Sequence, residues 1–182
     1  MTSPAIGGDY ITQDDFEEQA ARLGREAGPT LLHERWTSGV MQASTLAAVI
    51  GAVWSMAEFP DDPAQDRSLP HEAWRDLFNA AGFTVGGRTI ERPSEPLRVY
   101  RGAISGRRRL WSWTTDPQVA QAFTVNTHRR YVMDGRPVRS EVWTTLAPAM
   151  SLLAINTADN TRDESEVVVD THALRIVRYE AT

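Results

Sequence analysis

The chain has 182 residues, of which 41% are hydrophobic and 24% are charged, as is usual for a globular protein. It contains no cysteine, and all 19 of its basic residues are arginine, because lysine is absent. These absences exclude disulfides, a thiolate nucleophile and zinc sites that need Cys ligands. They also exclude a Schiff-base lysine, a Walker-type phosphate-binding loop and a kinase. The chemistry that remains depends on carboxylates, histidine, hydroxyl groups and arginine.

The net charge of −5 is unevenly distributed along the chain. Residues 1–95 carry 7 Arg and 15 acidic residues, whereas residues 96–182 carry 12 Arg and 9 acidic residues. The second half is therefore the expected place for an anionic ligand, unless the difference is a chance one. We expect a cytoplasmic protein with no membrane partner, because no segment resembles a signal peptide and the apolar segment 46–57 is too short to span a bilayer. The exclusive use of arginine suggests a high-GC genome, of a bacterium or its virus.

Apolar spacing in the first half predicts three helical stretches, over 13–27, 30–57 and 70–81. Thr12 is expected to cap the first helix, and Gly28-Pro29 to end it. Ser38-Gly39 is expected to bend or split the second stretch. Ser68 is expected to cap the third helix, with Gly82 as its stop.

The second half is predicted to be rich in β-structure. Its expected strands lie over 97–101, 110–114, 138–145, 150–155, 165–170 and 173–180. Asp116-Pro117 is expected to start a short helix, because proline is favoured at the first helical position. The whole chain is therefore predicted to be α+β, with a helical region over 1–92 and a β-rich unit over 93–182 that pack together.

Three short pieces of the second half carry residues suited to chemistry. Val99-Tyr100-Arg101-Gly102 places an arginine and a glycine on a strand, and Ser112-Trp113-Thr114 places two hydroxyl groups on one face of the next strand. Glu164 and Glu166 then precede a very apolar run. Since these two glutamates are two positions apart, an extended chain points both carboxylates to the same face.

In this order, the three pieces resemble the Arg–Ser–Glu class of ADP-ribosyltransferases, of the toxin-like and ecto-enzyme type. That family has an Arg on its first strand, a Ser-x-Ser/Thr on the next and a Glu-x-Glu on a later strand. The resemblance covers roughly residues 97–180, and it departs from the family at Trp113, usually a small residue, and at Thr114, usually a second Ser. It implies an ADP-ribosyltransferase-like β-sandwich core that binds NAD over 93–182.

The resemblance implies catalytic roles for Glu166, Glu164, Arg101 and Ser112. Cleavage of the nicotinamide–ribose bond develops an oxocarbenium cation, which the Glu166 carboxylate would stabilise. Glu164 would orient or deprotonate the incoming nucleophile. Arg101 would hold a phosphate of the dinucleotide through two parallel hydrogen bonds, and Ser112 would fix the catalytic glutamate or the ribose.

The NAD-binding residues implied by the resemblance are Arg101, Gly102, Ser112, Thr114, Phe123 and Glu166. Gly102 would leave room for the backbone to meet the nicotinamide amide. In this family a Glu at the first position of the carboxylate motif, here Glu164, accompanies transfer to arginine. The expected partners are therefore NAD and a target protein with an exposed arginine. No metal is expected, since the four histidines lack ligand spacing, and the six tryptophans are expected in the core.

Two other functions stay open at the level of the sequence. The same residues would serve an NAD glycohydrolase that uses water as the acceptor. A non-catalytic module could instead bind nucleic acid through Arg107-Arg108-Arg109, although this triplet is more commonly a solvated loop and the acidic net charge argues against it. Each motif residue could also be an ordinary strand residue at the surface.

Overall fold

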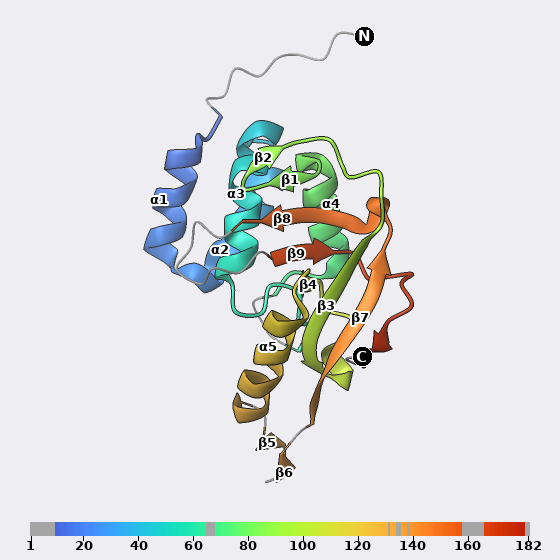
Figure 1. Ribbon diagram of the computed structural model, residues 1–182. Coiled ribbons are helices and arrows are strands. Elements are labelled where there is room, and N and C mark those ends of the chain that lie inside the picture. Colours follow the sequence, from blue (N-terminus) through green and yellow to red (C-terminus); the bar gives the residue numbers. More distant parts are fainter. Residues whose placement is uncertain are drawn as a thin grey trace. The chain divides into compact units, whose positions relative to one another are not determined.

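The computed structural model describes residues 10–64, 68–130, 132–133, 136–137, 139–157 and 166–180. Contacts within the chain divide it into two units, 1–81 and 82–182. Among the described residues, four α-helices lie in the first unit, and a mixed eight-stranded sheet with a fifth helix lies in the second (Figure 1). The expected mixture of helices and strands is confirmed, whereas the ADP-ribosyltransferase-like sandwich stays a prediction. Within these ranges, no helix has the length and apolar content needed to cross a membrane.

The helices of the first unit are α1 (Gln13–Leu23), η1 (Arg25–Ala27), α2 (Gly28–Thr37), α3 (Ala43–Met56) and α4 (His71–Ala81). The expected cap of α1 is confirmed, because the Thr12 hydroxyl accepts the Asp15 N–H while the Asp15 carboxylate accepts the Thr12 N–H. Hydrogen bonds from Thr12, chiefly that of its hydroxyl, hold the pKa of Asp15 below its usual value. The exposed carboxylate therefore stays charged at neutral pH beside the positive end of the helix.

The predicted end of the first helix is wrong. The helix ends at Gly24, whose φ of +85° suits glycine, and Gly28 and Pro29 instead form the first turn of α2. The expected split of the second stretch is confirmed, since α2 and α3 are separate helices and Gly39 between them has a φ of +74°. The stop at Gly82 is likewise confirmed. Helix α4 begins at His71, so Pro70 rather than Ser68 directly precedes it, and the Ser68 hydroxyl donates to the Asp62 carbonyl.

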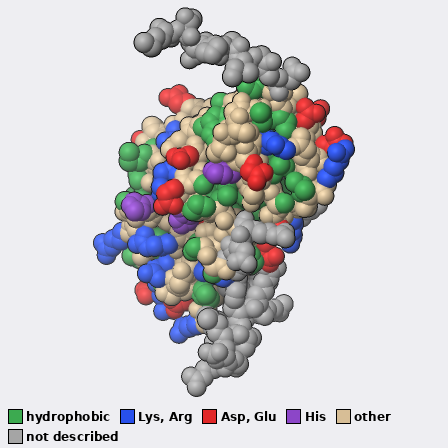
Figure 2. Space-filling model, turned by 180° about the vertical axis from the view of Figure 1, so that it is seen from behind, with side chains coloured by type: hydrophobic (Ala, Val, Ile, Leu, Met, Phe, Trp, Pro, Cys, Tyr) green, Lys and Arg blue, Asp and Glu red, His purple; other side chains and the backbone are tan. Residues whose placement is uncertain are grey.

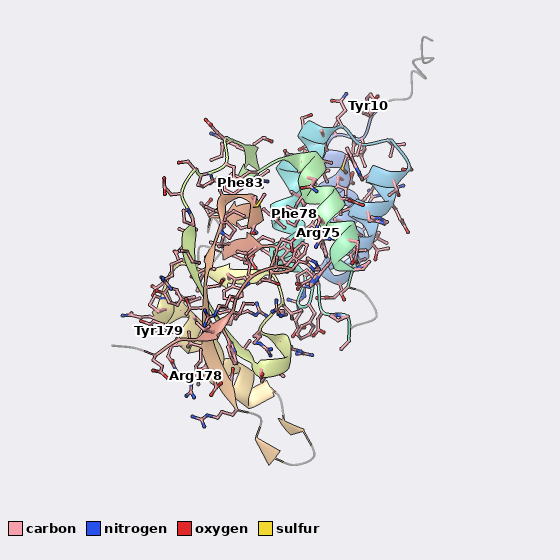
Figure 3. The ribbon with its side chains drawn as sticks, turned by 90° about the vertical axis from the view of Figure 1, so that its right-hand side faces the viewer. Tyr10, Arg75, Phe78, Phe83, Arg178 and Tyr179 are labelled. Atoms are coloured by element: carbon pink, nitrogen blue, oxygen red, sulfur yellow. The ribbon has the colours of Figure 1, made fainter. Side chains whose placement is uncertain are left out.

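Aromatic side chains form the centre of the first unit. The rings of Trp54 and Trp74 meet edge to face with centroids 4.9 Å apart, and both side chains are fully buried. Phe78, on α4 in Figure 3, packs against Trp54 at 5.7 Å. The Trp74 indole N–H donates to the Pro60 carbonyl at 2.7 Å, so its polar group is satisfied within the core. These two tryptophans therefore have the packing role expected of them.

The sheet of the second unit contains β1 (Thr84–Val85), β2 (Arg88–Thr89), β3 (Leu97–Ile104), β4 (Ser112–Thr114), β7 (Ser140–Ala147), β8 (Leu152–Asn156), β9 (Glu166–Val169) and β10 (Val177–Arg178). Its order is β10-β7-β3-β4-β9-β8-β1-β2, with β1 parallel to β8 and the other pairs antiparallel. The remaining elements are η2 (Ser105–Arg107), α5 (Pro117–Arg130), η3 (Ala149–Ser151) and the pair β5 (Val132–Met133) and β6 (Arg136–Pro137). The sheet thus places β3, β4 and β9, which carry the three motifs, side by side.

Several boundaries differ from the prediction. The hairpin of β1 and β2 was not expected, although its Gly86-Gly87 turn, with φ of +54° and +76°, is a typical hairpin signal. The border between the units consequently lies after Ala81, whereas the predicted border lies after residue 92. The helix that begins at Pro117 extends to Arg130 rather than being short, and the expected strand over 173–180 is confined to β10.

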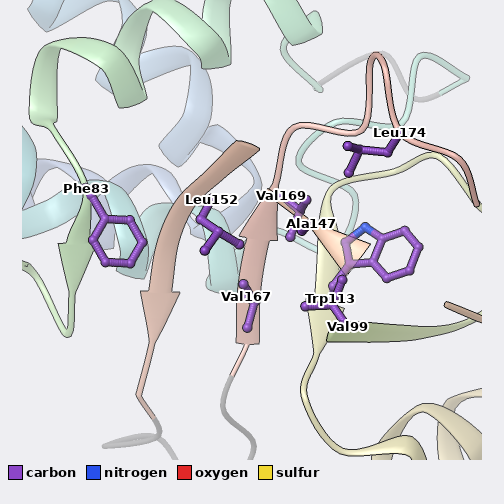
Figure 4. Packing of buried hydrophobic residues seen from close by; sticks show 8 residues of the cluster. All are labelled: Phe83, Val99, Trp113, Ala147, Leu152, Val167, Val169 and Leu174. Carbon is purple, nitrogen blue, oxygen red and sulfur yellow. The ribbon is translucent and has the colours of Figure 1, made fainter. Parts of the chain in front are cut away.

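One face of the sheet packs into the hydrophobic core of this unit (Figure 4). The buried members of that core are Phe83, Val99, Trp113, Ala147, Leu152, Val167, Val169 and Leu174. Because side chains alternate along a strand, the neighbours of Val99, Trp113 and Val167 point to the opposite face. This opposite face carries most of the residues that the motifs single out.

Candidate functional site

Hydroxyl and carboxylate side chains lie at neighbouring positions where β4 pairs with β9. Thr114 is the direct cross-strand partner of Glu166, and Ser112 is the partner of Val168. Directly paired residues point to the same face of a sheet, so Ser112, Thr114 and Glu166 share one face. Thr114 is buried, whereas Ser112 and Glu166 are half-buried and keep contact with solvent. The structure therefore brings two of the three motifs together on one surface.

Helix α5 meets the same face at Gly102. A Cβ at this position would lie 2.0 Å from the Ala120 carbonyl oxygen and 2.9 Å from the Cβ of Phe123. Phe123 therefore lies on the face of the sheet that carries Ser112 and Thr114, and its side chain is 40% exposed. The structure gives Gly102 a packing role that the sequence does not reveal, since the space left by its missing side chain is filled by the backbone of α5. A contact with the nicotinamide amide stays a prediction.

The Arg101 side chain points to the face of the sheet opposite to that of Glu166. Tyr100 pairs with Thr114 and therefore points to the same face of the sheet as Thr114. Arg101 is the next residue of β3, so its side chain points to the other face, which carries Val99 and the core. Its guanidinium donates from Nε to the Arg107 carbonyl at 3.1 Å and from Nη1 to the Ser112 carbonyl. Arg101 thus meets Ser112 through the main chain and ties the start of β4 to β3, but it does not share the face of Glu166.

Replacement of Arg101 by Lys is expected to lower the free energy of unfolding by about 1–3 kcal/mol, because an ammonium cannot reach both carbonyls in the geometry of a guanidinium. Urea denaturation would measure the change. Arg98→Lys is the matched control, since Arg98 is an exposed arginine on the same strand. Equal stability of the two variants would contradict this structural role of Arg101.

A further polar side chain contacts the carboxylate. Asn156, the last residue of β8, is the cross-strand partner of Glu166, and its Nδ2 donates to Glu166 Oε2 at 3.1 Å. Asn156 was not among the predicted site residues, because an amide at the end of an apolar strand has significance only once the register with β9 is known. Glu164 lies outside the described residues, so its predicted place beside Glu166 stays a prediction.

The arginine triplet serves the fold at two of its three positions. Arg109 donates from Nη1 to the Thr171 carbonyl at 3.0 Å, and Arg108 donates to the Ser105 carbonyl and lies 5.5 Å from the ring centre of Trp143. On the face seen in Figure 2, basic and acidic side chains are intermixed. These contacts account for Arg108 and Arg109 without a nucleic-acid ligand.

Comparisons of this chain with models of protein families, with curated proteins and with solved structures find no match. The function that we propose below rests on the chemistry of the face that carries Ser112, Thr114, Phe123 and Glu166. We call this surface the Glu166 face.

Proposed function

We propose that the chain is an NAD-dependent mono-ADP-ribosyltransferase that transfers ADP-ribose to a protein acceptor, with arginine as the acceptor, and releases nicotinamide. The observation that carries the proposal is the direct pairing of Thr114 with Glu166, with Ser112 on the same face. A carboxylate flanked by hydroxyl groups suits a sugar that becomes cationic, because the charge stabilises the cation while hydroxyls align the carboxylate and the ribose. The resemblance of the three motifs to the Arg–Ser–Glu class supports the same assignment.

In the proposed reaction, the bond between C1′ of the nicotinamide ribose and the ring nitrogen breaks, and its electron pair leaves with nicotinamide. Glu166 stabilises the cationic ribose and accepts a hydrogen bond from its hydroxyl. A guanidine nitrogen of the acceptor forms the new bond to C1′, and its proton passes to a base, for which we propose Glu164. The chain needs no thiol, lysine or metal for any of these steps.

The residues of the Glu166 face fit an NAD-binding role in part. Ser112 and Thr114 offer hydroxyl groups, and the exposed ring of Phe123 offers an apolar surface for a flat heterocycle. The excess of arginine over acidic residues in 96–182 suits the pyrophosphate. We assign Arg101 to holding β4 in place, because the hydrogen bonds named above go to main-chain carbonyls. Its contact with a phosphate remains a separate prediction.

Incubation of the protein with NAD labelled in its adenylate part and a bacterial lysate tests the proposal. We expect free nicotinamide in solution and label on proteins, and mass spectrometry should find ADP-ribose on arginine. The protein itself should also carry label on some of its 19 arginines. Label confined to acidic residues or serine would contradict the arginine acceptor. Nicotinamide release without labelled protein would indicate a glycohydrolase, and no release at all would overturn the proposed function.

A further inference from the structure

An irregularity in β8 decides which side chain faces Glu166. The pairing of β8 with β9 runs from Leu152 opposite Val169 to Ala154 opposite Val168, so β8 contributes one extra residue at this point. Such a bulge shifts every later pair by one position. In the regular register that starts from Leu152 and Val169, Ile155 would face Glu166. With the bulge, Asn156 occupies that position instead.

The shift also determines the face of the sheet to which the neighbouring side chains of β8 point. Ile155 pairs with Val167 and packs against the hydrophobic core of this unit. Asn156 therefore points to the Glu166 face, where its amide nitrogen donates to the carboxylate at 3.1 Å. The bulge thus serves both faces of the sheet, since it keeps isoleucine in the core and brings a hydrogen-bond donor to the carboxylate.

A neutral donor at this place has a defined chemical effect. The amide N–H restricts the rotation of the carboxylate that accepts its hydrogen bond, yet it adds no positive charge that would compete with a cationic sugar for the carboxylate. An arginine or lysine in its place would form an ion pair with the group that must stabilise the cation. An asparagine aligns the carboxylate without adding a charge of its own.

We propose that Asn156 is a positioning residue, which holds the Glu166 carboxylate oriented toward the ribose of NAD. This inference rests on the proposed function, because it assigns to Asn156 a role that acts through Glu166. It goes beyond the three motifs, none of which contains Asn156.

The test compares kcat and KM for nicotinamide release from NAD between the wild-type protein and Asn156→Asp. Aspartate has nearly the same shape but offers no N–H to Glu166 Oε2. We expect kcat to fall by about 10- to 10²-fold in Asn156→Asp while KM changes little, because a misplaced carboxylate weakens the stabilisation of the transition state rather than the binding of NAD. Asn156→Ala should show a similar loss of kcat. Asn79→Asp, which adds the same charge at an exposed position on α4, should leave both kcat and KM unchanged.

The outcomes separate this inference from the proposed function. If the wild-type protein releases no nicotinamide, the proposed function fails. If the wild-type protein is active and Asn156→Asp keeps both its kcat and its KM, the positioning role is overturned. A lower melting temperature with an unchanged kcat of the folded protein would also overturn it, because that result describes a contact that serves stability alone.

Discussion

Replacement of Glu166 by Gln is expected to lower the rate of nicotinamide release by about 10²- to 10³-fold, the usual cost of removing one group that stabilises transition-state charge. Glutamine keeps the size of the side chain, and its oxygen can still accept the hydrogen bond from Asn156. What is lost is the negative charge opposite the cationic ribose. Steady-state kinetics of nicotinamide release would measure the change, with calorimetry to show that NAD still binds.

The matched control for this variant is Glu95→Gln, because Glu95 is an exposed glutamate that precedes β3 and lies outside the Glu166 face. We expect its activity to equal that of the wild-type protein. Both variants should keep the melting temperature, since Glu166 is half-buried at the beginning of its strand. A fully active Glu166→Gln protein would contradict the mechanism, whatever it did to NAD affinity.

Replacement of Gly102 by Ala is expected to lower the free energy of unfolding of the second unit by about 1–3 kcal/mol or more, the range observed for overpacked interiors. The new methyl group would lie 2.0 Å from the Ala120 carbonyl oxygen and 2.9 Å from the Thr124 nitrogen. Both are backbone atoms, so no side-chain rotation relieves the clash. The helix must move away from β3. Urea denaturation followed by circular dichroism would measure the loss.

Gly106→Ala provides the control for a methyl group added without a clash. Gly106 lies in η2, where no atom comes within 4 Å of the place that an added Cβ would occupy and its φ is an ordinary one. We therefore expect it to match the wild-type protein in stability or slightly exceed it. If Gly102→Ala and Gly106→Ala had the same stability, the close approach of α5 to β3 would be wrong.

The sequence predicts which residues of one strand share a face, but it does not predict which strands pair with one another. Alternation along a strand predicts that Ser112 and Thr114 share a face, and this needs no knowledge of the rest of the chain. The pairing of Thr114 with Glu166 requires the sheet order, which depends on contacts between distant segments. The direction of Arg101 depends on the same information, because the face of a strand residue has meaning only relative to the core.

Two details could not be predicted from the sequence, namely which glycine ends α1 and which side chain of β8 faces Glu166. Gly24 and Gly28 both lie near the predicted helix end, and which of them ends the helix depends on the backbone angle that packing imposes. The place of Asn156 beside Glu166 depends on one extra residue in β8, since the register without it would present Ile155 to Glu166. A bulge leaves no clear signal in a run of apolar residues, and so the sequence alone cannot assign the amide to the site.

The two edges of the sheet bear on how the protein behaves at high concentration. β2 and β10 are both two-residue strands, and each presents an exposed arginine, Arg88 and Arg178. Short edges offer few unpaired main-chain groups to another chain, and an exposed charged side chain at an edge opposes pairing with a second sheet. The eight-residue β7 pairs with β10 only at Trp143 and Thr144, so the terminal strands limit edge-to-edge aggregation only over the part of the sheet that they cover.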